Sequence, residues 1–215
     1  MARNPKAKNY RDLRRRVGNR PSYDRILIVC EGEKTECNYF KEIRRKARIP
    51  SAHVHVLPTD LGTDPRKVVE SAQDVFNQKD KAFERVYAVF DRDDHPHYET
   101  AIQMAAARNK KIKNDEKRPV EFETIVSVPC FELWLLLHFE DAQSWIHRNV
   151  VLRKLRTHIE RYEKGMANLF ALTEPSLPAA TCRAQSLKLA HEKIPGNELY
   201  TDVHELVKYL TSIKR

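Results

Sequence analysis

The chain has 215 residues, with 39 Lys and Arg against 30 Asp and Glu, so its formal net charge is +9. This length suits one sizeable hydrophobic core with an appendage. A positive excess of this size favours polyanionic partners, of which nucleic acid is the commonest, although the charge could also serve solubility alone. No apolar run approaches the ~20 residues that a membrane span needs, and no apolar signal-peptide segment follows the N-terminus. We therefore expect no membrane association.

The four cysteines show neither a C-x-x-C pair nor the His and Cys spacing of a zinc site. They lie mostly in apolar stretches, so we expect reduced thiols in the core of a cytoplasmic protein.

Residues 1–22 are basic and poor in apolar side chains. Such a segment cannot bury enough apolar surface to fold alone, so we expect a disordered or partly helical arm. Its densest positive charge is Arg14, Arg15 and Arg16. These three are candidate nucleic-acid ligands, and the alternative is a solvated tail.

Four apolar stretches predict β-strands. The first, Ile26–Cys30, is an unbroken run that indicates a strand buried on both faces; the others lie at 53–57, 85–90 and 120–128. Helical patterns alternate with them, so we predict an α/β domain over 23–145 with a Rossmann-like, mainly parallel four-stranded sheet between helices.

The helix after the first strand carries Arg44 and Arg45 on its solvent side, as further candidates for nucleic-acid binding. Asp64 and Pro65 supply an N-cap and a first-turn proline for the next helix, and a third is predicted from about residue 98 to 111. Residues 129–139 are apolar nearly all round and predict a buried helix. Further helices at about 150–164, 179–193 and 201–213 predict a helical extension over 146–215, packed on the sheet domain.

Acidic residues follow two of the predicted strands: Glu31 after the first, and Asp91 and Asp93 after the third. The carboxyl ends of such strands form the crevice in which open α/β sheets bind ligands, so we expect these carboxylates to meet. Carboxylates without a thiolate or imidazole suit Mg²⁺ or Mn²⁺. The alternative is that these residues favour turns and helix starts, where negative charge is stabilising.

Several neighbours have two interpretations. Lys34 could stabilise developing phosphate charge or simply begin a helix, and Glu33 could be a ligand or a surface charge. Glu132 lies between apolar residues, where a carboxylate needs a partner. It could join the metal site or form an ion pair with an arginine. His138 we expect to be a hydrogen-bonded core histidine.

A strand ending in Glu-Gly and a later strand ending in Asp-x-Asp resemble the Toprim domain of topoisomerases, primases and OLD-type nucleases. Over about residues 25–210 the chain resembles the RloB-like family in particular. The stretches that carry this resemblance are Ile28–Glu36 with Tyr39-Phe40, Phe90–His95, Pro129–Phe139 and Thr201–His204.

The resemblance implies a Toprim-like, metal-dependent nuclease encoded near restriction-modification or abortive-infection loci, with an ATPase partner. By motif position, it makes Glu31 the Toprim glutamate and makes Asp91 and Asp93 the metal-binding pair. The leading hypothesis is a nuclease that acts on DNA or RNA in phage defence, with Glu31, Lys34, Asp91 and Asp93 catalytic and with Glu132 as a further metal ligand. The alternatives are a non-catalytic subunit that binds nucleic acid or an ATPase, and nucleotidyl transfer.

Overall fold

The computed structural model of the protein describes residues 24–62, 64–93, 95–142, 146–194 and 198–213. The predicted arm, with Arg14, Arg15 and Arg16, therefore lies outside the described residues. Among the described residues, no helix combines the length and the apolar character needed to cross a membrane.

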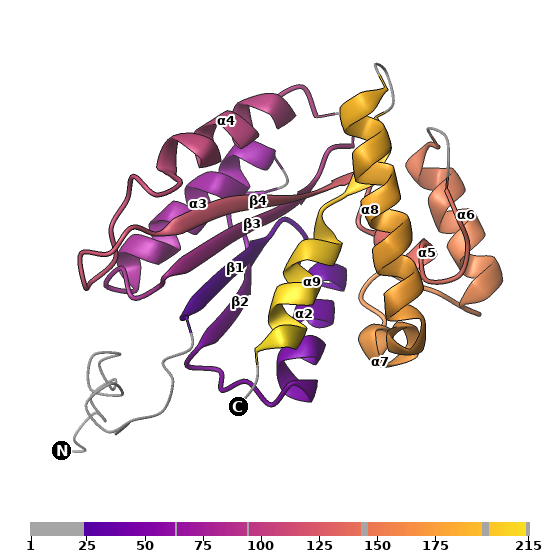
Figure 1. Ribbon diagram of the computed structural model, residues 1–215, viewed down its shortest axis with the longest axis horizontal. Coiled ribbons are helices and arrows are strands. Elements are labelled where there is room, and N and C mark those ends of the chain that lie inside the picture. The colour runs from indigo at the N-terminus through magenta and orange to yellow at the C-terminus, as the bar shows by residue number, and fades with distance from the viewer. Residues whose placement is uncertain (1–23, 63, 94, 143–145, 195–197, 214–215) are drawn as a thin grey trace.

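A single mainly parallel sheet forms the centre of the fold, with the strand order β2-β1-β3-β4-β5 (Figure 1). Its strands are β1 (Ile26–Cys30), β2 (Val54–Pro58), β3 (Arg85–Asp91), β4 (Glu121–Val128) and β5 (Tyr200–Thr201). The first four are parallel and β5 is antiparallel to β4. The predicted strand count of four was wrong, because a two-residue strand has no periodicity of its own. Only pairing with the edge of β4 defines it.

Helices cover both faces of the sheet and extend beyond the carboxyl ends of its strands. They are α2 (Thr35–Lys46), α3 (Pro65–Gln78), α4 (Tyr98–Arg108), α5 (Glu132–Leu136), α6 (Arg148–His158), α7 (Leu169–Thr173), the short 3-10 helix η1 (Glu174–Ser176), α8 (Leu177–Lys193) and α9 (Val203–Ser212). Figure 1 shows α3 and α4 on one face, α2 and α9 on the other, and α5 to α8 past the strand ends.

The position of β1 between two layers of helices explains why its sequence is apolar without alternation. Its odd and even positions enter different cores: Ile26, Ile28 and Cys30 pack on the side of α2 and α9. Leu27 and Val29 pack on the side of α3 and α4. A strand with helices on both faces has no solvent side, so it carries no polar residue.

Local signals placed some elements correctly and misjudged others. The Asp64 carboxylate accepts a hydrogen bond from the Arg66 backbone N–H at 2.9 Å, which confirms the predicted N-cap of α3. The buried helix predicted within 129–139 is present as α5, whose five residues are all buried, but its predicted extent was too long. The flanking turns form i→i−3 hydrogen bonds, such as Trp134 N–H to Phe131 C=O and His138 N–H to Leu135 C=O. Because nearly every position of this stretch is apolar, its sequence pattern does not reveal that the turns flanking α5 are tighter than an α-helix. Helix α7 was not predicted.

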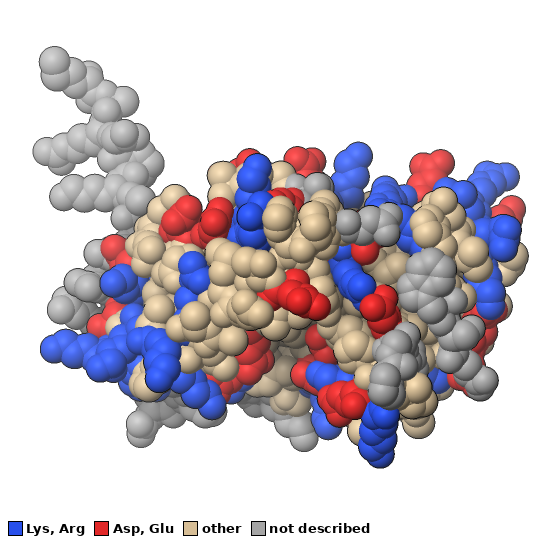
Figure 2. All heavy atoms as spheres, turned by 90° about the horizontal axis from the view of Figure 1, so that it is seen from above, with Lys and Arg blue, Asp and Glu red and all other residues tan. Residues whose placement is uncertain are grey.

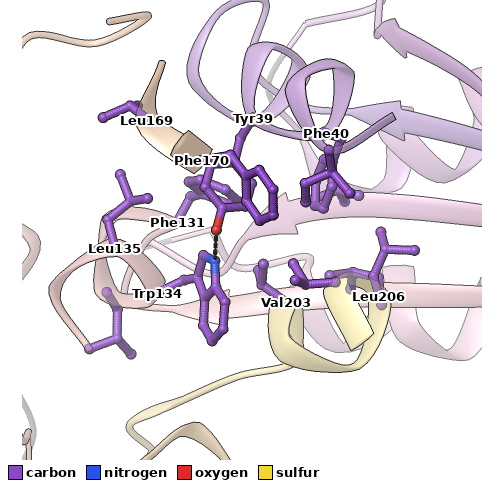
Figure 3. Close-up of a cluster of buried hydrophobic side chains, with 14 of the residues drawn as sticks. Tyr39, Phe40, Phe131, Trp134, Leu135, Leu169, Phe170, Val203 and Leu206 are labelled. Carbon is purple, nitrogen blue, oxygen red and sulfur yellow. Dashed lines mark hydrogen bonds between the residues drawn. The ribbon is translucent and has the colours of Figure 1, made fainter. Parts of the chain in front are cut away.

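The core on the side of α2 and α9 also joins α5 and α7 to α2 through aromatic side chains (Figure 3). Trp134 is fully buried, and its indole Nε1 donates to the Tyr39 hydroxyl at 2.9 Å. The Tyr39 ring packs edge-to-face on Phe131 and Phe170, with ring centroids 5.6 and 5.5 Å apart. Tyr39 therefore anchors the segment after β4 and the C-terminal helices to α2.

Arg25, just before β1, joins two loops at the amino end of the sheet. Its guanidinium pairs with Glu84 at 2.6 Å and with Asp115 at 2.7 Å, and all three side chains are at most 16% exposed. We predict that Arg25→Met lowers the free energy of unfolding by about 3 kcal/mol, because two largely buried carboxylates lose their shared guanidinium and Glu84 keeps only its pair with Arg118. Urea denaturation would measure this change.

The control is Lys46→Met, which removes an exposed ion pair with Glu174 and should change stability by less than about 1 kcal/mol. Equal losses from the two substitutions would contradict the structural role assigned to Arg25.

Candidate active site at the carboxyl ends of β1 and β3

The carboxyl ends of β1 and β3 lie side by side at the point where the chain changes direction across the sheet. From β1 the chain passes through α2 to β2 on one side, while β3 lies on the other side and follows α3. Because α2 and α3 cover opposite faces, this is the switch point at which open α/β sheets form a ligand crevice.

Glu31 and Asp91 meet at this point, as their positions after the strands predict. The Glu31 backbone N–H donates to the Val89 carbonyl at 2.8 Å, which extends the β1–β3 ladder by one step. The Glu31 carboxylate then accepts a hydrogen bond from the Asp91 backbone N–H at 2.9 Å. Asp91 itself is buried, with 8% of its surface exposed.

Glu36, in the first turn of α2, is a member of this cluster that sequence analysis missed. A Cβ on Gly32 would collide with the Glu36 carboxylate, so glycine at position 32 leaves room for that group. Side chains in the first turn of a helix point back toward its N-terminus. This geometry could have indicated from the sequence that Glu36 reaches the end of β1. The Glu36 charge acts on both Glu31 and Asp91.

Asp93 and Arg148 form an ion pair at the edge of the cluster. Asp93 has a left-handed backbone with φ of 39°, which turns the chain sharply after β3, and Arg148 is the first residue of α6. The Arg148 guanidinium also interacts electrostatically with Asp91 and Glu132. It is a cation that faces the acidic cluster, and it comes from the segment predicted as a helical extension. A second cation of that segment, Lys164, acts electrostatically on Glu36.

Glu132 begins α5 and is 2% exposed. Its carboxylate accepts a hydrogen bond from the Tyr162 hydroxyl at 3.2 Å, and its charge acts on Asp91. The two roles predicted for Glu132 were a metal ligand and an arginine ion pair. The structure shows a tyrosine as its hydrogen-bond partner and places Arg148 within electrostatic range.

Three carboxylates of the cluster, those of Glu31, Glu36 and Asp91, have raised pKa values. Burial, followed by repulsion from Glu36 and Asp93, raises the pKa of Glu31 from 4.5 to about 7. Burial and the charges of Glu36 and Glu31 raise the pKa of Asp91 well above its ordinary value, and burial raises that of Glu36. Full ionisation of these three groups would therefore be favoured by further positive charge at the site, beyond that of Arg148 and Lys164.

Hard oxygen donors concentrated in this way fit Mg²⁺ or Mn²⁺ in their chemistry. As they stand, no three Asp, Glu, His or Cys side chains among the described residues are arranged as a ready-made coordination shell. A shared ion would need the carboxylates to turn toward one another and Asp93 to exchange its Arg148 partner for the metal.

Other predicted site residues lie apart from the cluster. Glu33 and Lys34 are exposed, and the aliphatic stem of Lys34 packs against Gly165, where a Cβ would lie 2.8 Å from the Lys34 Cβ. Arg44 and Arg45 are at the opposite end of α2, and Arg44 Nη1 donates to the Val54 carbonyl at 3.1 Å. Their predicted role in nucleic-acid binding would therefore act at a distance from the acidic cluster.

His138 is a core histidine, as expected, but only half of its hydrogen-bonding capacity is used. Its Nδ1 lies 2.9 Å from the Trp134 carbonyl, while Nε2 is buried without a hydrogen-bond partner among the described residues. Burial lowers its pKa to about 4, so the ring is neutral.

The comparisons with known proteins gave one match. The model of the family described as RloB-like protein matches residues 26–210, which contain every described residue of the acidic cluster. No curated protein and no solved structure matches the chain.

Glu31 provides a pH test of the cluster. Because its pKa is about 7 in the folded protein and ordinarily 4.5, the folded state binds this proton more tightly than the unfolded chain does. That stabilisation is complete below pH 4.5 and is lost as the pH rises through about 7. We predict that metal-free Glu31→Gln gains about 2–3 kcal/mol over the wild type between pH 5 and pH 8, measured by urea denaturation in EDTA. The glutamine oxygen still accepts the Asp91 hydrogen bond, so a constant difference across this range would contradict the assigned electrostatics.

Proposed function

Because the chain belongs to the RloB-like protein family, we propose that it is a Mg²⁺- or Mn²⁺-dependent nuclease that hydrolyses phosphodiester bonds in DNA or RNA. The observation that carries the proposal is the meeting of Glu31 and Asp91 at the switch point of the sheet, where repulsion and burial raise their pKa values. Carboxylates held in this state are a functional-site signature. The Toprim-like character of the domain is part of the same proposal and rests on Glu31-Gly32 and Asp91-x-Asp93 at the two strand ends.

Each residue of the cluster has a proposed role. Glu31, Asp91 and Asp93 would hold the ion, and Glu36 and Glu132 add negative charge beside it. When bound, the ion would supply Lewis-acid stabilisation of a phosphate oxygen and a lowered pKa for an attacking water. Arg148 would pair with the scissile phosphate once it leaves Asp93, as guanidinium groups do with phosphate oxygens. Lys34, exposed on the same loop, could contact only a substrate that extends past the cluster.

The biological setting follows from the family resemblance. We propose a role in defence against phage, of the abortive-infection type, together with an ATPase partner. The net charge of +9 supports a nucleic-acid substrate, since it offsets the repulsion between an acidic site and a polyanion.

A second candidate function is a non-catalytic subunit that binds nucleic acid or an ATPase. Two observations favour it: Arg148 already supplies a counter-ion to Asp93, and no ready-made coordination shell exists among the described side chains. This function would be identified by tight nucleic-acid binding without cleavage in any divalent metal, if Asp91→Ala binds with the same affinity as the wild type.

Nucleotidyl transfer is a third possibility. Labelled nucleoside triphosphates would reveal it by the appearance of extended products.

The nuclease proposal predicts that the purified protein cleaves DNA or RNA with Mn²⁺ or Mg²⁺ and is inactive in EDTA. Glu31→Ala and Asp91→Ala should each reduce cleavage by about a hundredfold or more, because each removes charge that would hold the ion. Product analysis on denaturing gels measures cleavage, and circular dichroism checks the fold. Glu33→Ala, on the same loop but exposed, is the matched control and should remain active. Cleavage that persists equally in EDTA or in both active-site variants would refute the proposal.

For Arg148 we predict opposite effects on metal binding and on cleavage. Removing its charge in Arg148→Gln should tighten Mn²⁺ binding by about tenfold, because the cation no longer competes for Asp93. Cleavage should fall by about a hundredfold at saturating Mn²⁺, because a donor to the phosphate is lost. Titration calorimetry measures the first change, and single-turnover cleavage measures the second.

Arg153→Gln is the control for Arg148, since Arg153 is an exposed residue of the same helix. It should alter neither quantity. Weaker Mn²⁺ binding in Arg148→Gln would show that the guanidinium orders the ligands rather than competing with the ion.

A further inference from the structure

The opposite end of the sheet carries a dense group of lysines on two adjoining loops. These loops precede β3 and β4, and the Asp115 N–H of one donates to the Lys81 carbonyl of the other at 3.0 Å. Figure 2 shows Lys and Arg side chains gathered at the left end of the molecule, where Figure 1 places the loop between α4 and β4. Five exposed lysines define what we name the lysine edge: Lys81, Lys110, Lys111, Lys113 and Lys117.

The acidic side chains of these loops are largely engaged by arginines. Glu84 and Asp115 pair with Arg25, and Glu116 pairs with Arg118 at 2.8 Å. Within the described part of the chain, none of the five lysine ammonium groups has an ion-pair partner within 4.0 Å. Two carboxylates lie near these lysines: Asp80 is exposed beside Lys81, and the charge of Lys110 acts on Glu123. Five lysines against these two leave the lysine edge with an excess of positive charge.

Three of these lysines occupy a backbone conformation that disfavours them. Lys81, Lys110 and Lys117 have φ values of 56°, 58° and 62°. Glycine adopts this left-handed region without steric penalty, and asparagine is enriched there several-fold, whereas other side chains are uncommon. Asp80 of the same loop shares this conformation, with φ of 55°. Three of these four left-handed positions nevertheless carry lysine where glycine would be less strained, which points to a use for the positive charge.

We infer that the lysine edge is an anchoring surface for the phosphate backbone of duplex nucleic acid. Single-strand binding sites combine positive charge with exposed aromatic platforms for base stacking. Here the one aromatic residue of the two loops, Phe83, is 1% exposed. A surface of flexible ammonium groups with no exposed aromatic side chain suits binding to backbone phosphates. Such contacts do not depend on the base sequence.

The inference deepens the proposed function, on which it rests for the identity of the substrate. Strand β4 has eight residues, so the lysine edge lies roughly 26 Å from the carboxylate cluster along the sheet. At the 3.4 Å spacing of bases along each strand, this span corresponds to about eight base pairs. A duplex anchored at the lysine edge would therefore need at least about this length to reach the cluster.

The test measures binding in EDTA, so that it is independent of any cleavage. The full-length triple variant Lys81→Gly, Lys110→Gly, Lys117→Gly removes three charges and relieves three strained backbones. We expect an unchanged or higher melting temperature. Affinity for a fluorescent 30-bp DNA duplex should fall at least about tenfold, and the slope of log K against log salt should fall by about 2 to 3. The same duplex in RNA form shows whether the anchoring depends on the sugar.

The matched control is Arg153→Gln, Arg156→Gln, Arg161→Gly, which removes the same charge elsewhere. Arg161 also has a left-handed backbone, with φ of 57°. This control should bind the duplexes as the wild type does. An unchanged affinity in the lysine variant, or an equal loss in both variants, would overturn the inference. A loss for a single strand as large as that for the duplex would also overturn its assignment to duplex backbones.

Discussion

Crowding of carboxylates at the ends of β1 and β3 is the constraint on which the rest of this molecule depends. The ladder between the two strands continues one step past β1, so that the Glu31 carboxylate reaches the Asp91 backbone N–H. Glu36 approaches the same place because position 32 is glycine. The sheet thus buries carboxylates that also repel each other, and burial together with this repulsion raises the pKa values of Glu31 and Asp91.

The segment after β4 completes the environment of this cluster. It supplies Glu132 from α5, the cation Arg148 from α6, and Tyr162, whose hydroxyl binds Glu132. Aromatic contacts from Tyr39 hold α5 and α7 against α2. The C-terminal helices therefore belong to the proposed site as well as to the core, although they lie beyond the strand ends.

Charge is separated along the strand direction. The carboxyl ends of the strands carry the acidic cluster, and the amino ends carry the lysine edge and the basic end of α2, with Arg44 and Arg45. An acidic metal site repels the polyanion on which it would act, whereas a positive surface some distance away attracts it without neutralising the carboxylates. The proposed anchoring at one end and the proposed chemistry at the other would be a consistent physical division for a nuclease.

The amino-acid sequence was enough to predict the parallel strands and the position of Glu31 and Asp91, because an unbroken apolar run and a carboxylate at its end are local signals. It also determined the N-cap of α3 at Asp64. The folded structure was needed to reveal the pairing of β5, the place of Glu36 against Gly32, and Arg148 and Lys164, rather than Lys34, as cations near the cluster. Each of these depends on contacts between segments far apart in the chain, or on the direction of a side chain within a turn. Neither residue type nor spacing encodes such contacts.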